Sequence, residues 1–176
     1  LKEDGVAIIE FAYALDTIDR TEFDQVYHEH KCYFSLTSFQ RLCAQFNLAV
    51  TRVERLAIHG GSLRVFLRHA ARAVLDETVE QMLKQEDAWG VSTPVPYALF
   101  AERIEERKRN LLKLMRNLRA QGKRIAVYGA SAKGSTLMNA LGIGKDLIDY
   151  VVDRSTVKQG LFTPGTHLKI FPVEKL

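Results

Sequence analysis

The sequence predicts an α/β protein in which a mixed sheet is joined by helices to a second, smaller α/β unit. An almost continuous apolar run at residues 6–11 is typical of a strand buried on both faces of a parallel sheet. Helical periodicity dominates residues 73–121, and residues 122–176 open with a strand, a glycine-containing turn and a helix. We therefore expect a sheet region at 1–72, a helical linker at 73–121 and a second α/β unit at 122–176.

The composition is that of a soluble globular protein, with 47% hydrophobic and 26% charged residues among 176. The net charge of +4 includes the basic residues of 103–119, whose interleaved acids favour a solvated helix face over a nucleic-acid surface. No apolar run is long enough to span a bilayer. Cys32 and Cys43 lie at no metal-binding spacing. We expect a reduced, cytoplasmic protein with no nucleic acid and no membrane among its partners.

The first region is expected to continue from its strand through a long irregular segment, a helix and two paired strands. A long irregular segment after a buried strand is usually functional. Thr37 and Gln40 form a capping-box signature for a helix, which Asn47 can end in the left-handed conformation. Strands at 49–56 and 63–67 are joined across two glycines and are close enough to pair antiparallel. This order is typical of the last third of a mixed sheet, and we expect the chain to be part of a longer protein.

The linker region is predicted to contain two helices. The first is expected from near Asp76 to Gly90, and two prolines separate it from the second. The second runs from Tyr97 to Gln121, where Gly122 can end it. A helix of this length is expected to bridge two domains.

The last region is predicted to be Rossmann-like. Residues 124–128 have strand composition, 129–134 form a turn, and 135–141 have a helical pattern. A second strand at 147–152 ends in Asp153. This order of strand, turn, helix and strand is the opening unit of a Rossmann-like fold.

The turn of this unit has the spacing of a phosphate-binding motif. Gly129, Ser131 and Gly134 match a dinucleotide fingerprint in which serine replaces the middle glycine. Backbone N–H groups at such a helix N-terminus favour an anion, and Lys133 can add a positive charge. Because Lys133 precedes Gly134, the turn is not a Walker loop. The pattern predicts phosphate or nucleotide binding, and a strand–helix turn without a ligand stays open.

Three polar residues follow the second strand, where the carboxyl ends of a doubly wound sheet bind ligands. Asp153 can accept a hydrogen bond from a ribose or a base. Arg154 and Lys158 can contact a phosphate. Each of the three also fits a solvated loop.

Residues 27–30 place Tyr27, His28, Glu29 and His30 side by side in the irregular segment. In an extended segment the two histidines would share one face. Two imidazoles can ligate zinc, but the third ligand would have to come from elsewhere in the chain, and we expect no metal. An imidazole held by a carboxylate is a general base near neutral pH. We favour acid–base chemistry; structural hydrogen bonding stays open, and spacing does not decide which histidine acts.

A second candidate turn is the sequence His59-Gly60-Gly61-Ser62. It fits a backbone turn that binds an oxyanion or another anion. It fits a plain hairpin reversal equally well.

Several motifs, taken in order, resemble the sugar C-methyltransferase family. They are DQVYHEH at 24–30, YFSL at 33–36, HGGSLRV at 59–65, YGASAKG at 128–134, Asp149, VDR at 152–154, KQG at 158–160 and PGTH at 164–167. The resemblance extends over nearly the whole chain. It implies the C-terminal portion of a class I methyltransferase domain at 1–72 and a Rossmann-like nucleotide-binding domain at 122–176.

The resemblance also implies roles for the motifs. The family acts on nucleotide-linked keto-deoxysugars with S-adenosylmethionine as methyl donor. His30 is expected to remove the proton next to the sugar ketone, with His28 as the second candidate. Glu29 is expected to orient the base or stabilise its charged form, and Tyr27 to hydrogen-bond the substrate. The substrate's diphosphate is expected at the turn 129–134.

The family's glycine-rich methyl-donor loop and its cysteine cluster have no counterpart in this sequence. We therefore expect the complete enzyme to use S-adenosylmethionine, and these 176 residues alone to bind none and to be inactive. The alternative is a non-catalytic module that binds a nucleotide or a sugar nucleotide.

Overall fold

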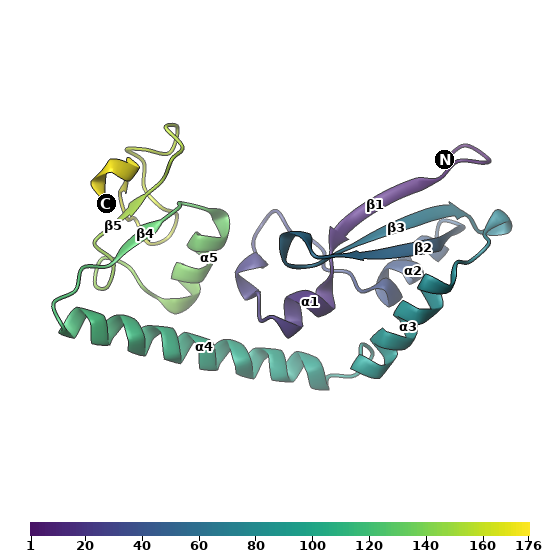
Figure 1. The fold of residues 1–176 in the computed structure, drawn as a ribbon, viewed down its shortest axis with the longest axis horizontal. Helices are drawn as coiled ribbons and strands as arrows, with labels where there is room; N and C mark the ends of the chain where they lie inside the picture. The colour runs from purple at the N-terminus through teal and green to yellow at the C-terminus, as the bar shows by residue number, and fades with distance from the viewer. The chain divides into compact units, whose positions relative to one another are not determined.

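Two units make up the computed structural model, which describes residues 1–176 (Figure 1). The first unit comprises Leu1–Glu22 and Cys32–Ala101, and the second comprises Phe23–Lys31 and Glu102–Leu176. The segment Phe23–Lys31 therefore belongs with the second unit, although the residues on both sides of it belong to the first. The predicted α/β class is confirmed. The division into domains at 1–72, 73–121 and 122–176 stays a prediction.

The first unit contains a three-stranded sheet in the order β1-β3-β2, in which both pairings are antiparallel. The strands are β1 (Ala7–Ala12), β2 (Leu48–Leu56) and β3 (Ser62–His69). The predicted pairing of the second and third strands is confirmed. The prediction that residues 6–11 are buried on both faces in a parallel sheet is wrong. β1 pairs only with β3, and its Ile8 side chain is 60% exposed.

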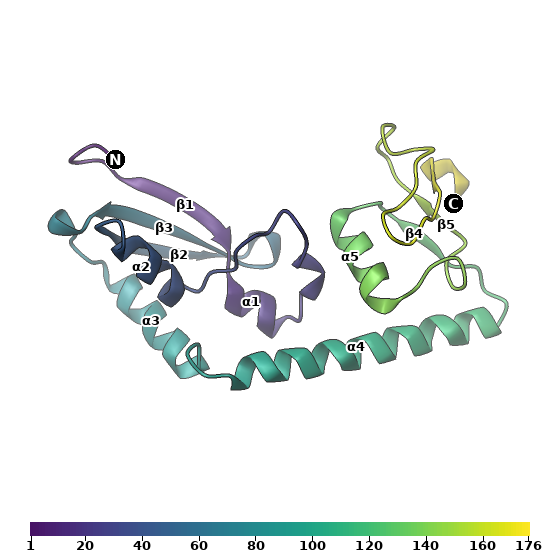
Figure 2. The ribbon, with the colours of Figure 1, turned by 180° about the vertical axis from the view of Figure 1, so that it is seen from behind.

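Helices α2 (Leu36–Ala44) and α3 (Glu77–Trp89) pack against the same face of this sheet (Figures 1 and 2). The predicted ends of α3 are confirmed, because Asp76 caps its start and Gly90 follows it with a φ of 88°. The predicted capping box of α2 is wrong. Ser35 and Ser38 form that box instead. The core between sheet and helices includes Tyr13, Leu36, Phe39, Val50, Val53, Leu63, Val65, Leu67, Val79 and Met82.

The other face of the sheet carries charged side chains that pair across the strands. Arg64 on β3 forms ion pairs with Glu10 on β1 at 3.0 Å and with Glu54 on β2 at 3.5 Å. These side chains are about a third exposed. Exposed pairs of this kind contribute little to stability, about 0–1 kcal/mol each.

The second unit contains a parallel sheet in the order β4-β5-β6. Its strands are β4 (Ala126–Tyr128), β5 (Tyr150–Val152) and β6 (Ile170–Phe171). Helix α5 (Ala132–Leu141) connects β4 to the rest of the unit, and α4 (Val95–Ala120) precedes β4. The core includes Met115, Met138, Leu141, Ile143, Leu147, Ile148, Val151, Leu168 and Ile170. The predicted Rossmann-like order of strand, turn, helix and strand is present.

Two differences from the predicted elements have local causes. Helix α5 begins at Ala132 rather than at 135, because the Ser131 side chain caps it. Residues 147 and 148 are buried but precede β5, because Leu147 and Ile148 both donate backbone hydrogen bonds to Gly144 O. Gly122 ends α4 with a φ of 75°, as predicted.

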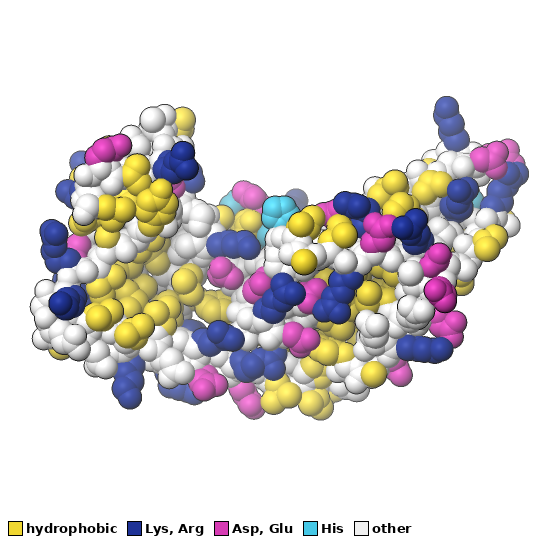
Figure 3. All heavy atoms as spheres, viewed as in Figure 1, with side chains coloured by type: hydrophobic (Ala, Val, Ile, Leu, Met, Phe, Trp, Pro, Cys, Tyr) yellow, Lys and Arg dark blue, Asp and Glu magenta, His cyan; other side chains and the backbone are white.

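No helix combines the length and apolar character needed to cross a membrane. Lys and Arg side chains are interspersed with Asp and Glu on the face drawn in Figure 3. Mixed surface charge of this kind is ordinary for a globular protein.

Candidate active site

The segment with Tyr27 and His30 packs within the second unit. Its first turn, the 3-10 helix η1 (Phe23–Gln25), contacts α5. Residues 27–30 then form a reverse turn, in which the His30 N–H donates to Tyr27 O at 3.0 Å. The segment is therefore not extended, so His28 and His30 do not share a face. The turn brings Tyr27 and His30 together instead.

Hydrogen bonds orient the His30 ring. His30 Nδ1 lies 2.8 Å from the backbone oxygen of Gln25, and Nε2 lies 3.3 Å from the Tyr27 hydroxyl. A carbonyl oxygen only accepts hydrogen bonds, so Nδ1 carries the proton and Nε2 is the acceptor. The Tyr27 and His30 rings lie 4.4 Å apart between centroids. His30 is thus held in the tautomer that offers a basic Nε2.

His28 and Glu29 lie on the exposed side of the same turn. The Glu29 carboxylate lies 3.9 Å from His28 Nε2, and the two side chains are 65% and 85% exposed, respectively. The sequence predicted that Glu29 orients His30. In this structure the Glu29 carboxylate faces His28, and the Gln25 carbonyl orients His30.

The turn at 129–134 leads from β4 into α5. Gly129 has a φ of 97°, and its N–H donates to Val152 O at 2.7 Å. Ser131 caps α5 by accepting from the Gly134 N–H at 3.0 Å. The helix N-terminus predicted for an anion is therefore formed, with Lys133 in its first turn.

Asp153 and Lys158 hold this turn in place. The Asp153 carboxylate accepts from the Ala130 N–H at 2.7 Å and from the Ser155 N–H at 2.8 Å. Lys158 Nζ donates to Ala130 O at 2.9 Å and lies 3.6 Å from Asp153 Oδ2. The N–H groups of Ser155 and then Ala130 lower the pKa of Asp153. Arg154 is exposed.

A cavity of about 740 Å³ brings the two predicted motifs together within the second unit. Tyr27 and His28 line it from the reverse turn, and Ser131 lines it from the start of α5. Lys158 also lines it. Its apolar wall is formed by Val26, Leu161, Phe162, Pro164 and Ile170. A volume of this size is typical of a site for a small organic ligand.

Two comparisons with known sequences identify the family of the chain. Residues 57–176 match the sequence model of the C-methyltransferase C-terminal domain. The C-methyltransferase NovU of Streptomyces niveus is 36% identical over 179 residues. The chain belongs to the C-methyltransferase family. The alignment covers 99% of this chain and 42% of NovU, so the chain spans less than half the length of that relative.

Membership in this family favours a methyltransferase over a purely non-catalytic nucleotide-binding module. No three His, Cys, Asp or Glu side chains in the chain come together to hold a metal ion.

Two contributors to the site were not predicted from the sequence. The backbone oxygen of Gln25 orients His30, and no side-chain pattern signals a carbonyl in that role. The apolar wall around Phe162 comes from the loop between β5 and β6. The signal available in the sequence was an aromatic residue, Phe162, two residues before the PGTH motif at 164–167. In the structure its side chain is exposed.

The replacement Asp153→Asn is expected to destabilise the chain at neutral pH, with a difference from the wild type that shrinks in acid. The pKa of Asp153 is lower in the folded than in the unfolded chain, so its carboxylate stabilises the fold above the unfolded pKa. That contribution is lost as the pH falls below the unfolded pKa and through the lower folded pKa. Urea unfolding followed by circular dichroism at several pH values measures it. A difference that is constant down to pH 2.5 would contradict this role.

Proposed function

We propose that this chain supplies the proton-abstracting and substrate-binding part of a C-methyltransferase that acts on a nucleoside-diphosphate keto-deoxysugar. One observation carries the proposal. His30 offers a basic Nε2 beside Tyr27, and Tyr27 lines the same cavity as the helix N-terminus at Ser131. Tyr27, which bonds to the base, and the phosphate site thus line one cavity of suitable size, and the His30 ring lies behind Tyr27 and is not itself among the lining residues.

The diphosphate would be bound at the start of α5. The N–H groups of Ala132 and Lys133, the first two helical residues, have no partner within the helix. They lie at the positive end of the helix dipole, which favours an anion. Lys133 and Arg154 add positive charge. Lys158 lines the cavity, although its ammonium group also bonds to Ala130 O.

The chemistry begins at the carbon next to the sugar ketone. His30 Nε2 takes the proton from that carbon, and the electron pair of the broken C–H bond moves into the carbonyl group to form an enolate. The Gln25 carbonyl stabilises the imidazolium through Nδ1–H. Once Nε2 is protonated, the Tyr27 hydroxyl no longer donates to it and is free to donate to a substrate oxygen. The enolate carbon is then the nucleophile for methylation.

The methyl donor does not fit the residues of this chain, and we assign no step to it here. β1 passes into α1 (Ala14–Asp19) through Tyr13, which is 1% exposed, without a glycine-rich turn. The glycine-containing turn at 129–134 presents the N–H groups at the start of α5, which favour an anion. S-adenosylmethionine carries a sulfonium cation instead. We propose that the complete enzyme holds S-adenosylmethionine with residues outside these 176.

Thymidine diphosphate is expected to bind the chain more tightly than thymidine, because the diphosphate meets the α5 N-terminus. Lys133→Ala should weaken binding by about tenfold, the usual effect of one hydrogen bond to a charged group. Lys145→Ala, an exposed lysine away from the cavity, is the matched control and should leave the dissociation constant unchanged. Isothermal titration calorimetry measures the dissociation constants of the wild type for both ligands and of the two variants for thymidine diphosphate. Equal affinities for diphosphate and nucleoside would refute this placement of the substrate.

A further inference from the structure

Three exposed apolar side chains line the cavity of about 740 Å³ in the second unit. They are Val26, Leu161 and Phe162, which are 54%, 56% and 57% exposed. Single exposed apolar side chains are ordinary on a protein surface, but a group of them in one cavity marks a ligand-binding surface. Neither the base proposed at His30 nor the phosphate site at the start of α5 accounts for this apolar wall.

Two of these side chains, Leu161 and Phe162, lie on a short hairpin in the loop between β5 and β6. The Gly160 N–H donates to Ile170 O, and the Ile170 N–H donates to Leu161 O, both at 2.9 Å. Phe162 then forms an antiparallel β-bridge with Lys169. These contacts fix the backbone that carries the aromatic ring of the wall.

Thr163 closes the hairpin beyond Phe162. Its N–H donates to Leu168 O at 2.9 Å, and its hydroxyl oxygen accepts from the Leu168 N–H at 3.0 Å. The hydroxyl oxygens of Thr163 and Thr166 lie 2.7 Å apart. Thr163 and Leu168 are each 1% exposed, so the hydrogen bonds between them are shielded from water. The turn at 164–167, which forms the tip of the hairpin, is therefore fixed at its base.

Asn139 of α5 attaches this turn to the helix. Its Nδ2 donates to Pro164 O at 3.1 Å and to Ser135 O at 2.8 Å. Gly165 has a φ of 76°, and a Cβ there would lie 2.0 Å from Asn139 Oδ1, so only glycine leaves room for the Asn139 amide. The amide thus holds the hairpin with one hydrogen bond to the loop and one to its own helix.

One side of α5 lines the cavity along most of its length. The lining residues are Ser131, Ala132, Ser135, Thr136, Asn139 and Ala140. They recur every three to four positions, so they share one side of the helix. Ser131 and Asn139 are eight residues apart, which is about 12 Å along a helix axis. A nucleoside diphosphate, with its pentose between phosphate and base, can extend from the proposed phosphate site to the hairpin attached at Asn139.

We propose that Phe162 is a specificity-determining residue whose ring stacks on the nucleobase of the substrate, and that Asn139 is the positioning residue that holds this ring against α5. The inference rests on the proposed function, which puts the diphosphate at the start of α5. A nucleobase has a flat face that stacks on an aromatic ring. The keto-deoxysugar fits the apolar wall less well, because its oxygens would lose hydrogen bonds to water there.

The test measures binding of thymidine diphosphate, thymidine and inorganic pyrophosphate to the full-length enzyme by isothermal titration calorimetry. Phe162→Ala is expected to weaken binding of thymidine diphosphate and of thymidine by the same factor, about ten- to a hundredfold. Pyrophosphate affinity should stay within about twofold of the wild type, because pyrophosphate has no base to stack. Phe162→Tyr should bind all three ligands as the wild type does, because it keeps the ring.

The matched control is Val157→Ala, which shortens another apolar side chain of the same loop. Val157 is 82% exposed and is not among the residues that line the cavity. Its replacement should leave all three dissociation constants unchanged.

Asn139→Ala tests the positioning role. It is expected to weaken thymidine diphosphate binding several-fold and to have no further effect in the Phe162→Ala background, because the position of the hairpin no longer matters once the ring is gone. A merely structural role of Asn139 would weaken binding by the same factor in both backgrounds.

The assignment of Phe162 is overturned if Phe162→Ala binds thymidine and thymidine diphosphate as tightly as the wild type, or if it loses pyrophosphate binding to the same extent. Equal effects of Asn139→Ala in the two backgrounds overturn the positioning role. The proposed function fails separately, if the wild type binds thymidine diphosphate no more tightly than thymidine or if His30→Asn retains proton exchange. The thymidine measurement on Phe162→Ala still tests the stacking surface in that case, because thymidine carries no phosphate.

Discussion

Replacing His30 with asparagine is expected to abolish exchange of the proton next to the ketone and to lower turnover by at least about a thousandfold. General-base catalysis by a positioned side chain contributes about 10²–10⁴-fold, and methyl transfer cannot proceed without the carbon nucleophile. The asparagine amide can still donate to Gln25 O, as His30 Nδ1–H does, so the reverse turn should survive. Sugar-nucleotide binding should therefore persist while chemistry is lost.

Three measurements on the full-length enzyme decide whether His30 is the base. Deuterium incorporation into the substrate reports proton abstraction, product formation reports methylation, and calorimetry reports binding. His69→Asn is the control, since His69 lies on β3 in the first unit and its ring nitrogen lies 3.3 Å from Leu1 O. If exchange survives in His30→Asn but disappears in His28→Asn, the base is His28, and the tautomer argument made for His30 is wrong.

Local sequence signals were sufficient for most elements of the fold. The apolar run of β1, the Asp76 cap and Gly90 end of α3, and the glycine that ends α4 were all predictable, because neighbours in the sequence determine them. The turn at 129–134 was also predicted, from the spacing of its two glycines and its serine, but the start of α5 was not, because Ser131 caps the helix within that turn.

What the sequence could not predict depends on partners far along the chain. Thr37 and Gln40 have the pattern of a capping box, yet Glu86, 49 residues after Thr37, takes the Thr37 hydroxyl instead. The burial of β1 was overestimated, because an apolar run does not reveal how many neighbours a strand has.

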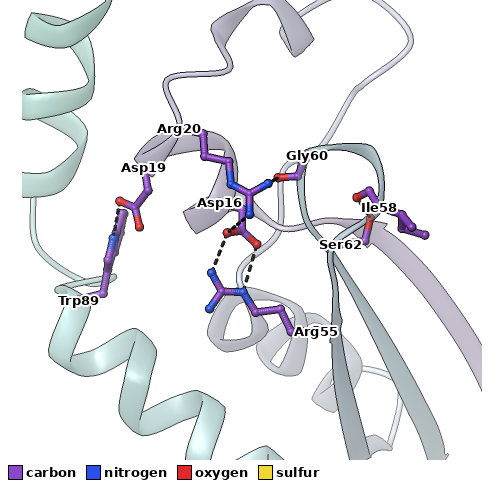
Figure 4. A network of polar contacts seen from close by, with 8 residues as sticks. All are labelled: Asp16, Asp19, Arg20, Arg55, Ile58, Gly60, Ser62 and Trp89. Atoms are coloured by element: carbon purple, nitrogen blue, oxygen red, sulfur yellow. Dashed lines mark hydrogen bonds and ion pairs between the residues drawn. The ribbon is translucent and has the colours of Figure 1, made fainter.

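The candidate site shows the same limit. The side chains of residues 27–30 are evident in the sequence, and their chemistry follows from their types. Their arrangement does not, because the turn that joins Tyr27 to His30 is closed by backbone groups. Asp16, in the first unit, likewise has no local motif, and only the folded chain shows Arg55 at its carboxylate (Figure 4).

The replacement Gly61→Ala is expected to destabilise the first unit by about 3 kcal/mol or more. Gly61 has φ 116° and ψ 124°, a conformation that other residues rarely adopt, which alone costs about 1–3 kcal/mol. A Cβ at this position would also overlap with the Oδ2, Cγ and Cβ atoms of Asp16. Asp16 cannot move away freely, because it is buried and ion-paired with Arg55, and breaking such a pair is itself destabilising.

The neighbouring glycine offers a matched control, because it separates backbone strain from steric overlap. Gly60 also has a positive φ, 87°, but a Cβ there would meet the carboxylate end of the flexible Glu22 side chain. Gly60→Ala should therefore cost only about 1–2 kcal/mol, the penalty for a left-handed alanine. The single tryptophan, Trp89, donates to Asp19 within the first unit, so its fluorescence in urea reports unfolding of that unit. Gly61→Ala should lower the urea midpoint by about 1 M or more, and Gly60→Ala by clearly less. Equal midpoints for the two variants would mean that Asp16 yields to the new methyl group, and that Asp16 does not hold this turn rigidly.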